Sequence, residues 1–445
     1  MALEQPLPAH GGWHRRVLQL ALPVVLANLT QPILGAVDTA VAGHLGSAAD
    51  LGGVAIGGLF FNFVFWGFGF LRMGTTGLVA QAYGAGDGQA LRANVARALL
   101  LALAIGTLIF ACQKPLIHHA LALIGGSDAV LDNARRYCQA RIGAAPFALA
   151  NYVVLGYLLG VQRVRIALLI QLLINAVNLL AILGYVHGCG WGIAGIGAAT
   201  ATADIAGLVI GAFILWPLRP RRPDWRSVVE PVALKRLVAV NRDLFLRTLC
   251  LLTSFGWFAH VGARQGDAIL AANALLLNFQ TFTAYGLDGF AHAAEALTGA
   301  AIGRRDRDAF CRAVTVNLFW SVLGALGYTL IYWSAGAWII DRLTDQTTIR
   351  VNAQTFLPWV AALPLVSVWG FLLDGVFIGA TRTRELAQAM AVSLLLFFCA
   401  ASLLVGTFGN RGLWLALLAF MAARALTLLP FLPRIVRELR PSGVS

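Results

Sequence analysis

Residues 31–46 read QPILGAVDTAVAGHLG, an apolar stretch with a single carboxylate, Asp38, near its middle. Without that residue the stretch would be typical of a membrane helix, although Pro32 and Gly35 lie close by. An ionisable side chain deep in a lipid bilayer is costly, so it marks a candidate functional group. Whether Asp38 lies in a bilayer depends on the rest of the chain.

The composition of the chain is that of a membrane protein. Of its 445 residues 59% are hydrophobic and 12% are charged, and the mean hydropathy is +0.76. Apolar runs of about 20 residues, the length of a membrane-spanning helix, recur throughout, whereas a barrel would show alternating segments of about ten. We therefore predict an all-α polytopic membrane protein with twelve transmembrane helices. They are expected at 16–43, 51–82, 92–119, 132–161, 165–187, 191–217, 239–263, 268–301, 312–340, 350–380, 385–407 and 411–433.

The basic residues indicate the orientation of these helices. The net charge is +13, but most of the 33 Lys and Arg residues lie in short loops that fall on one side of the membrane, so the charge reports topology rather than nucleic-acid binding. A smaller set, including Arg141, falls on the opposite side. The positive-inside rule then places both termini in the cytoplasm of a multi-pass protein of the inner (plasma) membrane, in contact with the lipid bilayer.

The two halves of the chain resemble each other at an offset of 219 residues. For example, GVQRVR (160–165) corresponds to GATRTR (379–384). The offset superposes the first six predicted helices on the last six and predicts two pseudo-symmetric six-helix lobes, the layout of alternating-access transporters. A repeat can also be an evolutionary relic in a protein with another task. The expected domains are an N-lobe at 1–217, a cytoplasmic linker at 218–238 and a C-lobe at 239–445.

Asp38 is the clearest intramembrane acid of the first half. An apolar environment disfavours the charged form of a carboxyl group, which brings proton uptake and release into a physiological range. Pro23 and Pro32 lie on the same predicted helix and can kink it. Asp38 is thus a candidate proton switch; the alternative is an aspartate that is permanently hydrogen-bonded and holds helices together.

Further polar groups lie in the predicted helices that follow. Tyr137, Asn178 and Thr200 fall in three of them, and Asp204 comes one turn after Thr200. Such groups can bind a ligand or a proton. Asparagine in a bilayer, however, more often joins helices through hydrogen bonds.

One predicted helix of the second half carries three titratable groups on one face. Asp288, His292 and Glu295 are spaced i, i+4 and i+7. Three ligands on one helix cannot enclose a metal ion, so we expect these acids to pair with Arg247 or Arg424, which lie inside other predicted helices.

An aromatic run, FFNFVFWGFGF (60–70), can line a pocket for aromatic or cationic compounds, or can face lipid. The candidate cavity residues are Phe60, Phe61, Phe63 and Trp66.

Nothing in the sequence points to an enzyme or to a bound metal. The six cysteines are scattered, with no Cys-x-x-Cys or Cys/His spacing, and neither His-Glu-x-x-His nor Gly-x-Ser-x-Gly occurs. We expect no catalytic residues, no metal and no cofactor other than a coupling ion.

Five long motifs of the chain closely resemble those of one family. They are LALPVVLANLTQPILGAVDTAVAGHLG, FLRMGTTGLVAQAYGAGD, NRDLFLRTL, TFTAYGLDGF and LLDGVFIGATR. On these motifs the chain is similar, from about residue 12 to 435, to the DinF-like branch of the multidrug and toxic compound extrusion (MATE) transporters. The resemblance implies two six-helix lobes around a V-shaped cleft. It also implies antiport, in which inward flow of H⁺ or Na⁺ drives export of cationic or amphipathic small molecules; H⁺ is the usual ion in this branch, and we expect a monomer.

The resemblance also assigns roles to residues of the first half. Asp38 matches the aspartate proposed as the protonation site, and Pro23 matches the proline at which that helix bends. Asn178, Tyr137 and Thr200 match the polar cluster that hydrogen-bonds around the aspartate.

One position departs from the family pattern. Ile182 stands where the family has a second aspartate, which leaves Asp38 without that partner and keeps both H⁺ and Na⁺ coupling open. In the second half, Asp374 resembles an acid implicated in cation binding in other branches, and Glu295 and Asp288 are weaker matches. A lipid-linked oligosaccharide flippase of the same superfamily is the nearest rival, but it would need more helices or a strongly basic central cavity.

Overall fold

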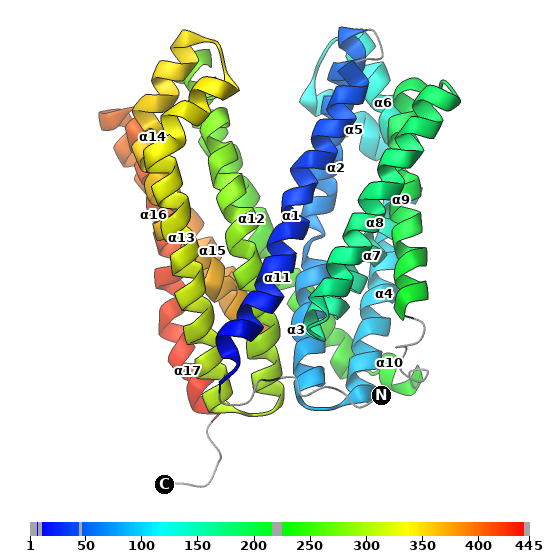
Figure 1. Cartoon of the computed structure of the whole chain (residues 1–445), viewed down its shortest axis with the longest axis vertical. Coiled ribbons are helices and arrows are strands. Elements are labelled where there is room, and N and C mark those ends of the chain that lie inside the picture. Colours follow the sequence, from blue (N-terminus) through cyan, green and yellow to red (C-terminus); the bar gives the residue numbers. More distant parts are fainter. Residues whose placement is uncertain (1–6, 8–10, 44–46, 216–224, 440–445) are drawn as a thin grey trace. The chain divides into compact units, whose positions relative to one another are not determined.

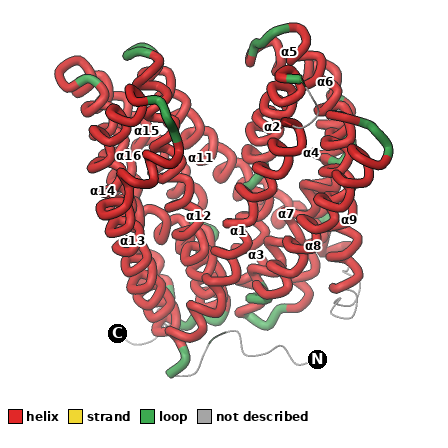
Figure 2. The backbone as a smooth tube through the Cα atoms, turned by 45° about the horizontal axis from the view of Figure 1, so that its top comes forward, coloured by secondary structure: helices red, strands yellow, loops and turns green. Residues whose placement is uncertain are grey.

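The computed structural model describes residues 7, 11–43, 47–215 and 225–439, with the side chains of 31–34, 36, 48 and 215 left out. Within these ranges the secondary structure is helical and contains no strand (Figure 2), which confirms the all-α prediction. The helices of the first half are α1 (Trp13–Gly43), α2 (Ala48–Gly67), α3 (Phe70–Gly84), α4 (Gly88–Ala111), α5 (Gln113–Ile124), α6 (Asp128–Ile142), α7 (Ala145–Gly160), α8 (Val164–Ile182), a π-helical turn (Leu183–Gly188), α9 (Gly192–Leu215) and α10 (Trp225–Val228). Those of the second half are α11 (Pro231–Ala263), α12 (Asp267–Gly303), α13 (Arg307–Leu343), α14 (Thr347–Gly379), α15 (Thr383–Phe408), α16 (Asn410–Leu428), a 3₁₀ turn (Leu429–Phe431) and α17 (Leu432–Glu438) (Figure 1).

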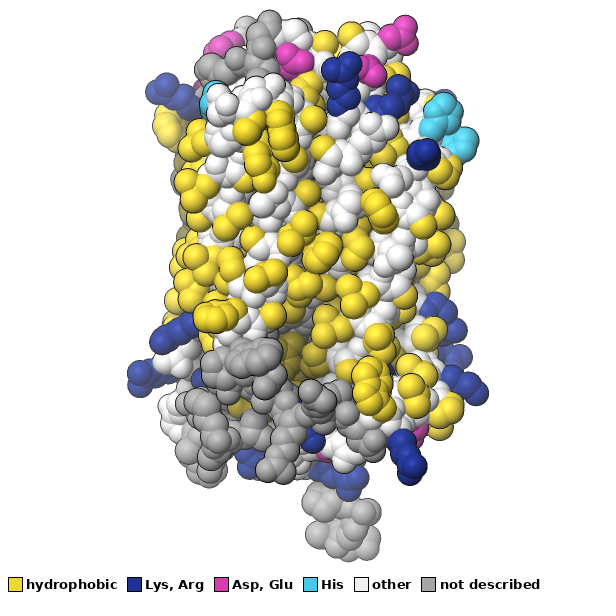
Figure 3. Space-filling view, turned by 90° about the vertical axis from the view of Figure 1, so that its right-hand side faces the viewer, with side chains coloured by type: hydrophobic (Ala, Val, Ile, Leu, Met, Phe, Trp, Pro, Cys, Tyr) yellow, Lys and Arg dark blue, Asp and Glu magenta, His cyan; other side chains and the backbone are white. Residues whose placement is uncertain are grey.

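These helices suit a bilayer. Among the described residues nine spans are long and apolar enough to cross a membrane, or ten if α6 and α7, bent by 58°, form one span. The long helices α1 and α12 account for the two remaining predicted segments. On the face in Figure 3, hydrophobic side chains cover the broad middle and charged ones gather near the two ends. The chain is thus a multi-span membrane protein, and its described helices are consistent with the twelve predicted segments.

Helix breaks are the main local difference from the prediction, and they occur in the first half. The predicted span 51–82 is two helices, interrupted at Phe68 and Gly69, and the span 132–161 is interrupted at Gly143 and Ala144. Proline is well tolerated in the first turn of a helix, and Pro146 lies in the first turn of α7. The corresponding helices of the second half, α12 and α14, run without a break.

The internal repeat is visible in the helix boundaries. The first residues of α2, α4, α6 and α8 lie 219 positions before those of α12, α13, α14 and α15. The chain also turns in the same way after equivalent helices, because Gln162 and Thr381, 219 residues apart, have φ angles of 61° and 52°. Two stretches of different sequence thus adopt the same helical framework.

The described chain packs into two compact units that interleave in sequence. Unit 1 comprises Met1–Val25, Ala80–Gly86 and Ala239–Ser445, and unit 2 comprises Leu26–Val79 and Asp87–Val238. Unit 1 therefore corresponds broadly to the second half of the chain, and unit 2 to the first half. Two segments of the first half pack with unit 1, and α1 contributes residues to both units.

The predicted linker at 218–238 contains helical residues in its described part. Its first part lies outside the described residues, but α10 follows and α11 already begins at Pro231. Arg97 of α4 holds α10 by donating to the carbonyl oxygens of Ser227 and, across 3.0 Å, Val228. The division into the lobes 1–217 and 239–445 stays a prediction.

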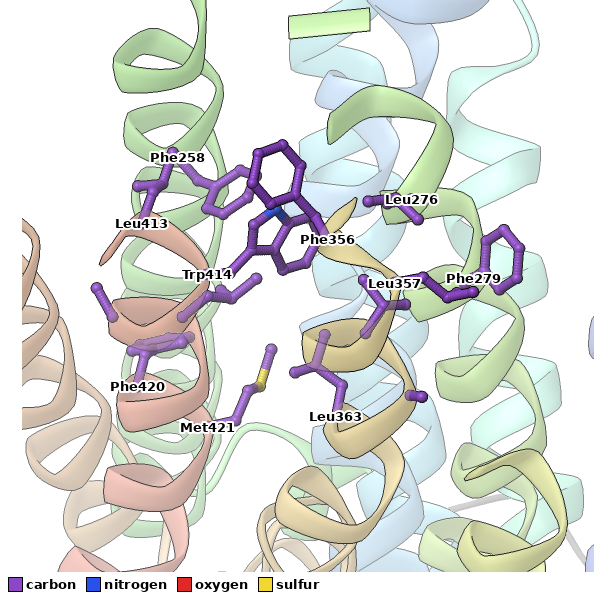
Figure 4. Close-up of a cluster of buried hydrophobic side chains, with 14 of the residues drawn as sticks. Phe258, Leu276, Phe279, Phe356, Leu357, Leu363, Leu413, Trp414, Phe420 and Met421 are labelled. Carbon is purple, nitrogen blue, oxygen red and sulfur yellow. The ribbon is translucent and has the colours of Figure 1, made fainter. Parts of the chain in front are cut away.

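Unit 1 has a dense apolar core between α11, α12, α14 and α16. Trp414 is fully buried and meets Phe258 edge to face, with 4.9 Å between ring centroids (Figure 4). The indole N–H of Trp414 is satisfied by Asn273 Oδ1 at 2.9 Å, and Asn273 and Asn410 donate to each other's amide oxygens at 2.8 Å. A buried polar group costs little when it is bonded in this way.

Candidate functional site

The polar groups of unit 2 meet around Arg141, in the last turn of α6. Its guanidinium interacts electrostatically with Asp38 of α1 and with Asp204 of α9. Both acids are half-buried, and Asp38 Oδ1 has no hydrogen-bond partner among the described residues. Asp38, the candidate proton switch, thus interacts with a half-buried cation that a second acid shares.

Tyr137 and Phe61 hold the Arg141 side chain. Arg141 Nη1 donates to the Tyr137 hydroxyl at 3.0 Å, one helical turn away, and the guanidinium carbon lies 4.4 Å from the centroid of the Phe61 ring. Tyr137 is fully buried, and Gly57 makes room for it, because a Cβ there would lie 2.3 Å from Tyr137 Cδ1. These contacts create a cation–π arrangement in surroundings that are shielded from water.

Asn178 and Thr200 form a second buried pair in unit 2. Asn178 Nδ2 donates to Thr200 Oγ1 at 3.1 Å, and Thr200 Oγ1 donates to the carbonyl of Ile196 at 3.2 Å. Ile182, at the position where the family pattern has an aspartate, is fully buried. Asp204 lies one turn beyond Thr200 on α9, so this helix links the amide pair to the Arg141 cluster.

Arg141 is the residue that the sequence analysis missed. It was counted among the basic residues on the side opposite the cytoplasm and given no role, whereas it lies in the last turn of α6 with its side chain half-buried in unit 2. Its spacing of four residues from Tyr137 places both on one face of a helix, which is the signal that could have revealed it.

The four aromatic cavity candidates separate into two pairs. Phe60 and Phe61 are buried, with 2% and 1% of their surface exposed, and Phe61 touches the Arg141 cluster. Phe63 and Trp66 are 58% and 49% exposed. Phe61 is thus the aromatic candidate in contact with the polar residues of unit 2.

Pro23 lies half-buried in the part of α1 that packs with unit 1, and α1 continues through it as a helix. The unit boundary falls between Val25 and Leu26, shortly after this proline.

In unit 1, Asp374 of α14 is bound by two arginines. Arg247 of α11 and Arg424 of α16 both donate to its Oδ2 atom, the latter across 2.6 Å. All three side chains are at least nine-tenths buried. Both guanidinium groups are thus committed to Asp374, rather than to the acids of α12 with which they were expected to pair.

The three titratable residues of α12 lie in unit 1 as well. Glu295 is fully buried, and its Oε2 lies 3.5 Å from His292 Nδ1. Asp288 lies two turns before Glu295 on the same helix. No group of three or more His, Cys, Asp or Glu side chains within the described ranges is arranged to hold a metal ion.

Comparison with known proteins identifies the family. The MatE family model matches residues 23–186 and 244–402, which together make up most of the chain. The chain belongs to the MatE family. MATE proteins are multidrug and toxic compound efflux transporters and are not enzymes, and the matched segments include Asp38 and Asp374.

Two relatives match nearly the whole length of the chain. It is 43% identical over 419 residues to DNA damage-inducible protein F of Escherichia coli, a match that covers 94% of this chain and 90% of that protein. It is 27% identical over 445 residues to the probable multidrug resistance protein NorM of Geobacillus kaustophilus, covering 95% and 94%. The first match confirms the resemblance to the DinF-like branch.

Solved MATE structures share the fold. A MOP superfamily transporter from Pyrococcus furiosus has a TM-score of 0.89 at 18% identity, with 99% of each chain covered. A MATE transporter crystallised in a straight conformation has a TM-score of 0.87 at 20% identity, again with 99% of each chain covered. These likenesses confirm the expected membrane fold.

Proposed function

We propose that this MATE protein is a proton-coupled antiporter that exports cationic or amphipathic compounds across the plasma membrane by alternating access. Asp38 is the coupling carboxylate in this proposal. Asn178, Tyr137 and Thr200 complete its polar surroundings, and Pro23 gives α1 its bend. We further propose that the protein works as a monomer with both termini in the cytoplasm.

The observation that carries the proposal is that Asp38 is half-buried, has an unpartnered carboxylate oxygen and interacts electrostatically with Arg141. A half-buried carboxyl group in a membrane helix exists in two forms that differ by a full charge, and an unpartnered oxygen leaves room for a proton or a cation. Coupling arises when proton and substrate compete for one group or favour different conformations. A protonated Asp38 therefore disfavours a bound cation, and release of the proton restores the negative charge that attracts one.

The surroundings of Asp38 favour an organic cation as substrate. Phe61 already holds a guanidinium at 4.4 Å, so this part of unit 2 accommodates a flat positive group against an aromatic face. Apolar surface next to a carboxylate suits compounds that are both cationic and lipophilic.

Sodium coupling through Asp374 is the alternative, and the contacts in unit 1 argue against it. Both arginines bind one carboxylate oxygen, Oδ2, and the other, Oδ1, has no hydrogen-bond partner among the described residues. The two buried positive charges already exceed the single charge of the carboxylate, so a sodium ion at Oδ1 would be repelled by both. H⁺ at Asp38 is accordingly the coupling ion that we propose.

The test is transport by the purified full-length protein in liposomes. The lumen is made acidic relative to the outside, Na⁺ is absent, and potassium with valinomycin clamps the membrane potential. Uptake of ethidium is followed by fluorescence for the wild type, for Asp38→Asn, and for the control Asp345→Asn, whose side chain is fully exposed. We expect gradient-driven uptake in the wild type and the control, and uptake at the level of empty liposomes in Asp38→Asn.

Three results would contradict the proposal. Full pH-driven uptake by Asp38→Asn would remove Asp38 from the mechanism. Uptake that requires Na⁺ and is lost in Asp374→Asn would move coupling to unit 1. Absence of uptake under either ion gradient, together with flipping of a fluorescent oligosaccharide lipid, would favour the flippase.

A further inference from the structure

Arg141 is held in place by contacts that leave its charge available. Its Nη1 is bound by Tyr137, its face lies on Phe61, and its Nε has no hydrogen-bond partner among the described residues. It forms no ion pair with Asp38 or Asp204 within 4.0 Å, although it interacts electrostatically with both. The guanidinium is thus near two acids and bonded to neither.

Other charged and titratable groups surround this cluster. Tyr152 of α7 interacts electrostatically with Asp204, with Arg141 and with Arg72 of α3, and Cys138 of α6 interacts with Arg141. Asp38 and Asp204 are the carboxylates with which Arg141 interacts. Asp38 and Asp204 each interact with Arg141, so the guanidinium is the charge that the two acids have in common.

We propose that Arg141 is a built-in cation that is shared between Asp38 and Asp204, sets the pH range in which Asp38 exchanges its proton, and competes with the cationic substrate. The inference rests on the proposed role of Asp38 and adds two residues, Arg141 and Asp204, to that mechanism. Arg141 acts through the carboxylates and is a positioning residue.

The charge states of the three groups explain the competition. With both acids ionised, the three charges sum to −1, and one monovalent cation restores neutrality. When Asp38 takes up a proton the sum is zero, and the Arg141 charge is balanced by Asp204 alone. A second cation is then unfavourable, because like charges at short range in a poorly solvated site repel strongly. The proton and the organic cation thereby exclude each other.

A purely structural role for Arg141 makes a different prediction. If the side chain only fills space beside Phe61 and Tyr137, its replacement lowers stability but does not change the pH at which Asp38 is protonated. The titration of Asp38 therefore separates the two roles, and it needs no substrate.

The experiment is infrared spectroscopy of the full-length protein, in which the carboxyl C=O band that is absent from Asp38→Asn is titrated with pH. Removing a positive charge beside a carboxyl group favours its protonated form, so in Arg141→Gln we expect the midpoint to rise by about one pH unit or more. Arg141→Lys retains the charge and should restore a midpoint near that of the wild type. Arg136→Gln is the matched control on the same helix, because Arg136 is exposed and pairs with Asp132 at 2.9 Å.

Asp204→Asn provides an independent test with the opposite sign. Without Asp204 the Arg141 charge acts on Asp38 alone, which favours the ionised form and lowers the midpoint. In the background of Arg141→Gln, the same change should have a much smaller effect, since no shared cation is left to redistribute. If Arg141→Gln fails to fold, Asp204→Asn alone still tests the inference, because a wild-type midpoint in that variant would contradict it.

Three results would overturn the inference: a wild-type midpoint in Arg141→Gln, a wild-type midpoint in Asp204→Asn, or an equal effect of Asp204→Asn with and without Arg141. Failure of the proposed function looks different, because Asp38→Asn would then keep pH-driven uptake. Asp38→Asn could lose uptake while Arg141→Gln and Asp204→Asn titrate like the wild type. Asp38 would then remain the coupling carboxylate, and Arg141 would not set its protonation range.

Discussion

Gly84 of α3 and Gly303 of α12, equivalent positions of the internal repeat, lie at one backbone crossing inside unit 1. A Cβ atom on Gly84 would be 2.0 Å from the carbonyl oxygen of Ala300, and one on Gly303 would be 2.0 Å from that of Gln81. The ends of two repeat-related helices thus touch through their main chains, where only glycine fits.

Replacing Gly303 by alanine should therefore destabilise unit 1. The new methyl group meets backbone rather than a side chain that can move, and overpacking of this kind costs about 1–3 kcal/mol. Thermal unfolding in detergent measures the loss. Gly327→Ala in α13 is the control, since nothing lies within 4 Å of its Cβ position, and it should leave the unfolding temperature unchanged or slightly raised. Equal unfolding temperatures for the two variants would mean that α3 and α12 do not cross so closely.

Asp374→Asn should lower stability more than it alters the pH dependence of transport. The change leaves Arg247 and Arg424 buried without their shared counter-ion, a loss of about 3–5 kcal/mol by analogy with other broken buried ion pairs. Thermal unfolding, with the exposed Asp345→Asn as control, measures the first effect. The pH profile of uptake in the surviving folded protein measures the second, and a profile displaced from that of the wild type would give Asp374 a part in coupling.

Transport should be insensitive to sodium. Because two guanidinium groups bind Asp374 Oδ2, we expect replacement of Na⁺ by choline to leave pH-driven ethidium uptake unchanged. Initial uptake rates in liposomes, measured at fixed membrane potential with each cation, provide the comparison. A severalfold dependence of the rate on Na⁺ would contradict the prediction.

Thr200→Val should reduce proton-coupled uptake, and Thr200→Ser should restore it. Valine has nearly the shape of threonine but cannot accept the hydrogen bond from Asn178, whose buried amide then lacks a partner at a cost of about 1–3 kcal/mol. Serine keeps the hydroxyl. Initial uptake rates and unfolding temperatures should fall together in the valine variant; similar values in all three proteins would limit the Asn178–Thr200 pair to a minor role.

The helices could be located from the sequence because their signal is strong and repeated. Long apolar runs show where a chain can cross a bilayer. The offset of 219 residues also relates Gln162 to Thr381, and both residues have a positive φ. The breaks at Phe68 and Gly143 were not predicted. Apolar composition continues across them, and a bend that neighbouring helices stabilise leaves little trace in hydropathy.

The partners of the buried charges were harder to predict. Arg247 and Arg424 were expected to pair with the acids of α12, whereas both bind Asp374 of α14. Depth along a helix and rotation about its axis decide such pairing, and neither follows from spacing within one helix. Arg141 was missed for a related reason, because counting basic residues per loop cannot show that one of them turns inward.

The early segment Ala80–Gly86 packs with unit 1, most of which is encoded in the second half of the chain. Gln81 Nε2 donates to the carbonyl oxygen of Gly379 at 2.9 Å, and these two residues are 298 positions apart. During synthesis, α3 therefore enters the membrane long before the ribosome has made the helices that it will contact. Insertion order and assembly order must differ in this protein, so the first half cannot be completed as a separate folding unit.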